Sequence, residues 1–340
     1  MRRPLIWVVF LLLLVTACSP VEGGFEGLPQ PTAIATQWVL EVDDSEPAEA
    51  VAVTPTPQRP TLAPTEVSEP ELTGLACGEV FCALAWPGWL ARPIGEGFTR
   101  TIDRSYPYGS TANGNFDLHY GVEFPNGHGT PVLAAQDGEV IFAGPDSQTQ
   151  LGPFVGFYGQ VVILLHTGLL DGAQDVYTLY AHLSEIEVEV GDRVSAGQEI
   201  GRVGATGAAD GSHLHFEVRV AHNDYASTTN PVLWFAPLDD TEHQATVTLA
   251  GHILDRGGNP VSKFPLTLEK LSTTGGVEAH YYPVTYYPAG VNGHPVMGEN
   301  FVVPDIPPGD YRLAFISGRM YEFFFTLEPG SLGFISVQLD

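Results

Sequence analysis

Residues 212–219 read SHLHFEVR, and this stretch decides the fold around it because apolar and polar residues alternate along its length. Side chains at alternate positions of a β-strand point to opposite faces of the sheet. A strand over this segment would bury the apolar residues and turn His213 and His215 toward the same cleft. Glu217 lies on the same side of the strand, where it could either orient a histidine or face solvent.

The same two-residue period occurs upstream, at His119, Gly121 and Glu123. The glycine leaves room between the two polar side chains for a metal ion or a substrate. A catalytic zinc ion takes three nitrogen or oxygen donors from the protein and keeps a fourth position for water. Two histidines and one carboxylate from these two segments meet that requirement.

Between Thr130 and Val220 the chain consists of short apolar runs separated by glycines, among them residues 160–166, 199–203 and 214–220. No run shows a convincing helical period. We therefore predict an all-β protein whose first folded part, residues 77–238, is an antiparallel β-sheet domain.

The last hundred residues continue with short alternating runs separated by regular turn signals, which favours a β-sandwich over residues 244–340. The pattern of residues 251–261, followed by residues 306–311, resembles the carboxypeptidase regulatory-like domains that are often appended to surface proteins. That resemblance implies no activity, but it leaves open a contact with other envelope proteins.

Four motifs of the first folded part occur in the order found in the lysostaphin-type endopeptidases. They are His119-x-Gly121-x-acid, Gly129-Thr130-Pro131-Val132, Tyr180-x-His182 and His213-x-His215. Any one of these motifs alone would be a weak signal of the family, but four of them in the correct order are a strong one. Through these motifs, roughly residues 100 to 235 resemble the LytM-like family, whose fold is the duplicated hybrid motif.

The resemblance implies a zinc metalloendopeptidase that hydrolyses peptide bonds in the stems or cross-bridges of peptidoglycan. Carried over residue by residue, it implies that His119, Glu123 and His215 hold Zn²⁺. It further implies that His182 and His213 transfer protons and stabilise the charged intermediate.

Glu123 departs from the family, which usually has an aspartate at this position. The longer side chain must retract, or the backbone must shift, although glutamate is itself an ordinary zinc ligand. We favour an active site of adjusted geometry. The alternative is a catalytically silent LytM-like envelope lipoprotein that activates a separate cell-wall amidase.

The chain opens with Arg2 and Arg3, followed by an apolar stretch from Leu5 to Val15. This pattern is typical of a secretory signal peptide, here residues 1–17. The step Val-Thr-Ala before Cys18 resembles the lipobox of bacterial lipoproteins, in which the cysteine is acylated. We therefore expect an exported protein with a lipid anchor at the outer face of the bacterial cell membrane.

Residues 18–76 are predicted to form a disordered tether, because residues 19–76 contain ten acidic residues and nine prolines but a single basic residue, Arg59. The whole chain carries a formal charge of −26. This charge argues against nucleic acid as a partner, since nucleic-acid binding depends on clustered Lys and Arg.

Only Cys77 and Cys82 remain after the lipobox cysteine. Both are expected on the exported side, where thiols tend to be oxidised. A small disulfide loop between them is the predicted outcome.

The lipid anchor is directly testable by replacing Cys18. Each buried methylene of an acyl chain contributes about 0.8 kcal/mol to membrane binding, so Cys18→Ala should release the protein from the membrane fraction. Fractionated cells and an immunoblot measure this. If the variant stays on the membrane as firmly as the wild type, the lipoprotein prediction is wrong.

Overall fold

The computed structural model describes residues 74–340 except 79, 87, 171–173, 239–244 and 287–290. All described residues belong to one unit. No helix in this described part is long and apolar enough to cross a membrane. The predicted signal peptide, the lipobox cysteine and nearly all of the predicted tether lie outside it.

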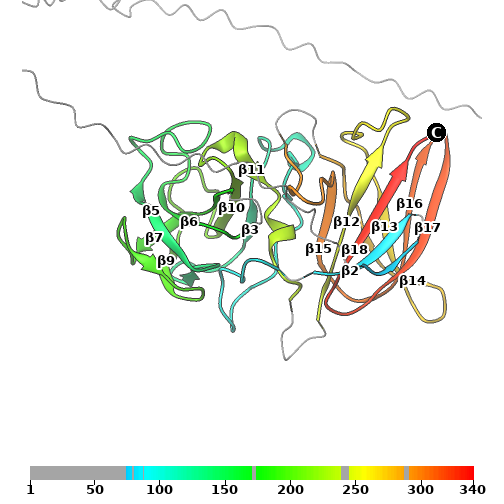
Figure 1. Ribbon diagram of the computed structural model, residues 1–340, viewed down its shortest axis with the longest axis horizontal. Helices are drawn as coiled ribbons and strands as arrows, with labels where there is room; N and C mark the ends of the chain where they lie inside the picture. The colour runs from blue at the N-terminus through cyan, green and yellow to red at the C-terminus, as the bar shows by residue number, and fades with distance from the viewer. Residues whose placement is uncertain (1–73, 79, 87, 171–173, 239–244, 287–290) are drawn as a thin grey trace, which may run out of the picture. The chain divides into compact units, whose positions relative to one another are not determined.

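The first sheet holds the strands between residues 122 and 229 (Figure 1). Its strands are β3 (Val122–Phe124), β4 (Pro131–Leu133), β5 (Gly138–Pro145), β6 (Gln160–His166), β7 (Val176–Ile186), β8 (Arg193–Val194), β9 (Glu199–Val203), β10 (Leu214–Val220) and β11 (Thr228–Thr229). The order is β11-β10-β7-β6-β5-β8, with β3 beside β10 and with β9 beside β4 and β7. Every pairing is antiparallel. The predicted antiparallel β-sheet domain is confirmed.

Short 3₁₀ helices account for the helical residues that the structure describes. They are η1 (Ala112–Gly114), η2 (Tyr225–Ser227) and η3 (Pro231–Trp234). In η3 the side chain of Asn230 accepts a hydrogen bond from the backbone N–H of Val232, and a proline at the first turn needs no partner for a backbone N–H.

Strand β10 lies between β7 on one side and β3 and β11 on the other, and it is covered on both faces. Its residues from Leu214 to Arg219 are all buried, including the charged ones. The alternation in the sequence correctly predicted two different faces, but the polar face is covered by protein rather than by solvent. Buried charges at these positions require partners inside the protein.

The C-terminal part forms two further sheets. A five-stranded sheet has the order β1-β2-β18-β12-β15, and a four-stranded sheet has the order β14-β13-β16-β17. The strands are β1 (Gly74–Cys77), β2 (Phe81–Ala85), β12 (Val247–Leu254), β13 (Thr267–Leu271), β14 (Val277–Tyr281), β15 (Phe301–Ile306), β16 (Gly309–Ser317), β17 (Arg319–Leu327) and β18 (Ser331–Gln338). Leu249 and Phe301 of the five-stranded sheet share one core with Leu268 and Tyr311 of the four-stranded sheet. This is the predicted β-sandwich, with one parallel pair, β12 with β18.

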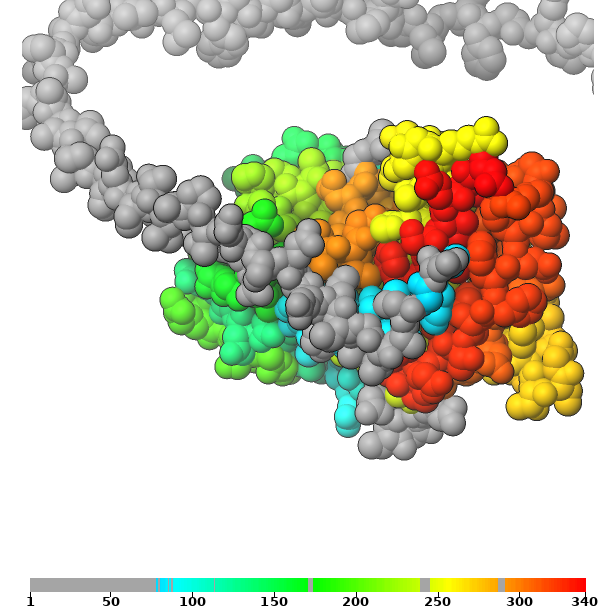
Figure 2. All heavy atoms as spheres, turned by 45° about the vertical axis from the view of Figure 1, so that its right-hand side comes forward, coloured from blue at the N-terminus to red at the C-terminus, as the bar shows by residue number. Residues whose placement is uncertain are grey.

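The hairpin β1–β2 corrects the predicted domain boundaries. The sequence predicts residues 74–76 as part of the tether and residues 77–85 as part of the first domain, yet β2 is hydrogen-bonded to β18 of the C-terminal sheet. Figure 2 shows the cyan atoms of this segment among the red atoms of the last strands. The first β-sheet domain is therefore inserted between β2 and β12 of the sandwich.

The hairpin also places the two cysteines. Cys77 and Cys82 are directly paired positions of β1 and β2, and Cys82 is disulfide-bonded. The side chain of Cys77 lies outside the described part, so its pairing with Cys82 stays a prediction.

A buried ion pair joins the inserted domain to the sandwich. The guanidinium of Arg92 donates to both carboxylate oxygens of Asp305, at 3.1 and 2.7 Å, and both side chains are buried. The backbone N–H of Ile102 donates to the same carboxylate at 2.9 Å. Because removal of one partner of a buried pair leaves an uncompensated charge, such a pair fixes the relative position of the elements that carry it.

A second buried carboxylate at this junction has no such compensation. Glu299 accepts hydrogen bonds from the hydroxyl of Tyr286 at 3.1 Å and from the backbone N–H of His294 at 2.8 Å. The Tyr286 hydroxyl in turn accepts one from Asn230 of the inserted domain at 2.5 Å. Burial raises the pKa of Glu299 to about 8.

This raised pKa predicts a pH dependence of stability. Between its ordinary pKa of 4.5 and about 8, Glu299 keeps its proton in the folded state but loses it in the unfolded state, so stability falls as the pH rises through this window. One pKa unit corresponds to about 1.4 kcal/mol, so Glu299 lowers the free energy of unfolding by a few kcal/mol by pH 8. The variant Glu299→Gln should remove this loss.

Thermal melts of the wild type and Glu299→Gln at pH 5 and pH 8 measure this effect. The advantage of the variant should grow with pH, whereas Glu328→Gln, at an exposed position, should give the same difference at both values. A pH-independent difference for Glu299→Gln would contradict the prediction.

Candidate metal centre

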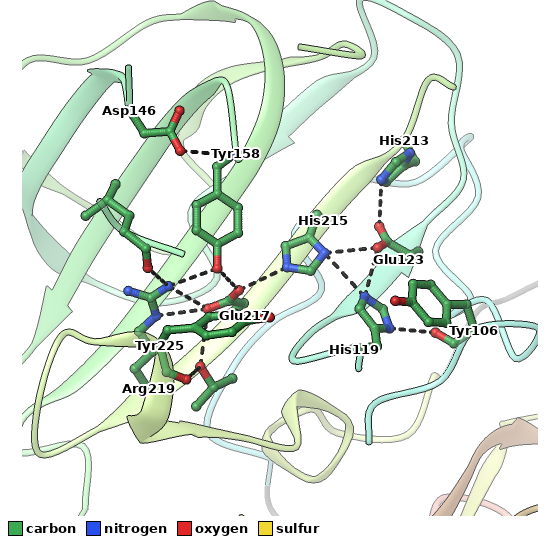
Figure 3. A network of polar contacts seen from close by, with 12 residues as sticks. Tyr106, His119, Glu123, Asp146, Tyr158, His213, His215, Glu217, Arg219 and Tyr225 are labelled. Atoms are coloured by element: carbon green, nitrogen blue, oxygen red, sulfur yellow. Dashed lines mark hydrogen bonds and ion pairs between the residues drawn. The ribbon is translucent and has the colours of Figure 1, made fainter. Parts of the chain in front are cut away.

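The pairing of β3 with β10 brings the predicted ligands together. In this antiparallel pair Glu123 is directly opposite His215, so the two side chains lie on the same face. His119 precedes β3 and is held by two backbone hydrogen bonds, from its N–H to Ser110 O and from Gly109 N–H to its carbonyl. Figure 3 shows the three side chains pointing toward one another.

The distances among the three side chains are short. Glu123 Oε1 lies 2.9 Å from His119 Nε2 and 2.9 Å from His215 Nδ1. The two ring nitrogens are 3.4 Å apart. A Cβ on Gly121 would come within 2.4 Å of the His215 ring, so the ring occupies the space that this glycine leaves open.

The other ring nitrogens are already bonded, and this determines which atoms face the centre. His119 Nδ1 is 2.7 Å from the carbonyl oxygen of Tyr106, which can only accept. His215 Nε2 is 3.1 Å from a carboxylate oxygen of Glu217, which also accepts. The second nitrogen of each ring, His119 Nε2 and His215 Nδ1, therefore faces Glu123. Burial opposes the charged form of His215, but the charge of Glu123 and the hydrogen bonds to Glu123 and Glu217 outweigh it and raise the pKa of His215 to about 10.

Three converging donors of this kind suit a metal cation, which would displace the proton of His215 when it binds. Two imidazole nitrogens and one carboxylate oxygen are the donor set of many catalytic zinc sites. The donor atoms of the three residues all lie within 4.8 Å of one another. The residues present therefore fit Zn²⁺.

His182 and His213 lie beside this centre. The ring centroids of His182 and His213 are 4.9 Å apart, and those of His182 and His215 are 5.6 Å apart. His182 Nδ1 donates to Thr206 O at 2.8 Å, which leaves its Nε2 as the lone-pair nitrogen. His213 Nε2 is 3.0 Å from Glu123 Oε2. The structure thus brings all five predicted site residues together.

The two histidines differ in their affinity for a proton. Burial, and secondarily the nearby His215, lower the pKa of His182 to about 4. Burial also opposes the charged form of His213, but the hydrogen bond to Glu123 and the charge of that carboxylate outweigh it and raise its pKa.

Behind His215 a buried network fixes the ring. Glu217 Oε1 accepts from His215 Nε2 and from the hydroxyl of Tyr158, while Oε2 accepts from Arg219 Nε at 2.9 Å and from Thr228 Oγ1 at 3.3 Å. Asp146 accepts from the backbone N–H of Tyr158 and so holds the loop that carries the hydroxyl. Of the two alternatives for Glu217, the structure supports the one in which it orients a histidine.

Three further side chains of the site were not predicted. Tyr106 stacks on His119 with ring centroids 4.1 Å apart, and Tyr158 and Arg219 complete the network around Glu217. Neither tyrosine belongs to a spacing pattern, so the sequence offers no signal for them. His166, in contrast, is buried elsewhere, with both nitrogens near Asp137 O and Thr178 Oγ1.

Comparison with known proteins agrees with this geometry. Residues 117–230 match the sequence profile of Peptidase family M23. This region is an M23 peptidase domain. The matched region contains all five residues of the centre and excludes the C-terminal sandwich.

The similarity to individual proteins is confined to the same region. Over 103 residues the chain is 40% identical to the DD-carboxypeptidase/endopeptidase Mpg of Neisseria meningitidis serogroup B. The aligned region covers 30% of this chain and 20% of that protein. Over 102 residues it is 38% identical to the peptidoglycan DD-endopeptidase ShyA of Vibrio cholerae, with the same two coverages. The solved catalytic domain of lysostaphin from Staphylococcus simulans shares 34% identity over 40% of this chain and 86% of that chain, with a TM-score of 0.29. The chain thus matches one fifth of the length of the two relatives.

Loss of the Glu217 charge should weaken zinc binding by the M23 domain. Partners of this kind orient a ligating ring and increase its basicity, and their removal typically costs about tenfold to a hundredfold in metal affinity. We expect that loss for Glu217→Gln and a smaller one for Tyr158→Phe, measured by competition with a zinc chelator.

The matched control is Glu185→Gln, in the same sheet but with a side chain that is 65% exposed. Tyr158→Phe retains the ring and only removes the hydroxyl, so it tests the network even if Glu217→Gln fails to fold. Equal zinc affinities of Tyr158→Phe, Glu217→Gln and the control would contradict the role assigned to the network.

Proposed function

We propose that this protein is a zinc metalloendopeptidase that hydrolyses peptide bonds in the stems or cross-bridges of peptidoglycan. The observation that carries the proposal is the convergence of three donor atoms, on His119, Glu123 and His215, with two further histidines beside them. The M23 match supports the same chemistry.

His119, Glu123 and His215 would hold the zinc ion, which supplies Lewis-acid activation of water and of the scissile carbonyl. The protein supplies the rest. The hydrogen bonds to Tyr106 O and Glu217 fix the tautomers of His119 and His215. Glu123 spans the centre, since its two oxygens lie near three different imidazoles.

His182 and His213 are placed to handle protons. General bases act within hydrogen-bond reach of the proton that they take. The Nε2 atoms of both rings are the ones not bonded to a backbone carbonyl. One ring can accept a proton from the attacking water while the other donates a hydrogen bond to the oxyanion.

The substrate class is proposed from the relatives. ShyA is by name a peptidoglycan DD-endopeptidase, and Mpg a DD-carboxypeptidase/endopeptidase. An exported chain with a lipid anchor at Cys18 would meet the same polymer outside the cytoplasm. The silent lipoprotein is disfavoured by the retention of all five site residues in one cluster, with only the conservative change to Glu123.

Substitutions at His215 and His213 should separate metal binding from catalysis. His215→Ala removes one of three donors, so both zinc and hydrolysis of purified peptidoglycan should be lost. His213→Ala removes no ligand, so about one zinc per chain should remain while turnover falls roughly a hundredfold or more. Metal analysis and chromatography of released muropeptides measure the two effects.

Glu123→Asp decides between the enzyme and the silent activator. Similar zinc content and turnover in the wild type and this variant would show that the backbone accommodates glutamate. If the wild type holds no zinc and releases no muropeptides while Glu123→Asp does both, the longer side chain has disabled the site, and the activator is the correct alternative.

A further inference from the structure

A cavity of about 390 Å³ lies where the M23 domain meets the sandwich. Its lining comes mainly from three segments, which contribute among others Arg104 and Ser105, Tyr281 and Tyr282, and Pro304. Ligand sites prefer such junctions between domains, and this volume lies within the range of small-molecule pockets. The residues of the metal centre do not line this cavity.

One segment separates the cavity from the metal centre. The ring of Tyr106 stacks on His119, whereas its neighbours Ser105 and Pro107 line the cavity. Val122 likewise lines the cavity, next to Glu123 of the centre. The two sites therefore lie on opposite sides of the same stretch of backbone.

The lining combines aromatic rings with hydrogen-bonding groups. Four tyrosines contribute, at positions 108, 281, 282 and 286, although the hydroxyls of Tyr108 and Tyr286 are already hydrogen-bonded inside the protein. Exposed polar groups of the lining lie on Arg104, Ser105 and Tyr282. Tyr282 is 70% exposed, and its ring is stacked only 8° from parallel with that of His280. Flat rings beside exposed hydroxyl and guanidinium groups suit a sugar, which has an apolar ring face and a polar edge.

The charge of the lining also differs from that of the chain. None of the residues that line the cavity is Asp or Glu, although the chain has forty of them. Arg104 lies over the Tyr281 ring at 5.4 Å and donates from Nη1 to the carbonyls of Pro304 and Asp305. A polymer whose peptides carry carboxylates is repelled by a charge of −26 overall, but not by this part of the surface.

We propose that the cavity binds the glycan strand of peptidoglycan, with an N-acetylated amino sugar against the tyrosines and its acetamido oxygen near Arg104. The identity of the polymer rests on the proposed function. Because Ser105 and Pro107 of the cavity flank Tyr106, which contacts His119, a strand bound here would lie next to the segment that borders the candidate metal centre. The sandwich would then contribute directly to substrate binding.

Chitotetraose, a soluble oligomer of N-acetylglucosamine without peptide, is the probe for this site. We expect the full chain in detergent solution to bind it in calorimetric titrations. Tyr282→Ala should weaken binding roughly threefold to tenfold, as for the loss of one aromatic contact. Arg104→Gln should also weaken it. Phe324→Ala removes a ring that is 67% exposed on β17, outside the cavity, and should leave binding unchanged.

The proposal is overturned if the wild type binds no chitotetraose, or if Tyr282→Ala and Phe324→Ala bind it equally well. It is also overturned if a free stem peptide binds in the cavity in place of the sugar. Tyr282→Ala remains decisive even if Arg104→Gln unfolds. Zinc content and hydrolysis of a soluble stem peptide, measured on the same samples, report on the proposed function separately and should not change in Tyr282→Ala.

Discussion

The antiparallel register of β3 and β10 is the constraint on which the candidate site depends. It places Glu123 directly opposite His215, while Glu217 follows two residues later in β10 and His213 directly precedes the strand. A shift of this register by one residue would turn each of these side chains to the other face. The apolar residues of β10, buried against the core of the sheet, make such a shift costly. Hydrophobic packing on one face thus determines the chemistry on the other.

Burial of the polar face is the second requirement. Glu217 and Arg219 lie inside the protein and compensate each other, and His215, Tyr158 and Thr228 also hydrogen-bond to the Glu217 carboxylate. The same principle holds at the junction with the sandwich, where Arg92 meets Asp305. Glu299 is the exception, because burial there is opposed by hydrogen bonds alone. Networks that are fully satisfied specify one arrangement of their members.

The two-residue period within short segments predicted the central strands and singled out His119, Glu123, His213 and His215. His182 and the role of each residue came only from the resemblance to the lysostaphin-type endopeptidases. The sequence did not predict β14 or β15, which lie at the edges of their sheets. β15 contains Pro304, which normally argues against a strand but is tolerated at an edge, and β14 has an exposed, irregular pattern. Tyr158 was also missed, since its contact with Glu217 spans 59 residues and depends on how a loop folds back. Local periodicity carries no information about such contacts.

The position of the hairpin β1–β2 determines how a mechanical load would pass through the molecule. The described chain enters the sandwich at Gly74, and β2 is hydrogen-bonded to β18 before the M23 domain begins. A pulling force applied through the residues before Gly74 would therefore act first on the hydrogen bonds of β1, β2 and β18. The sheet that carries the metal centre lies beyond them along the chain. Its ligand geometry would be shielded from tension until the hairpin had detached from the sandwich.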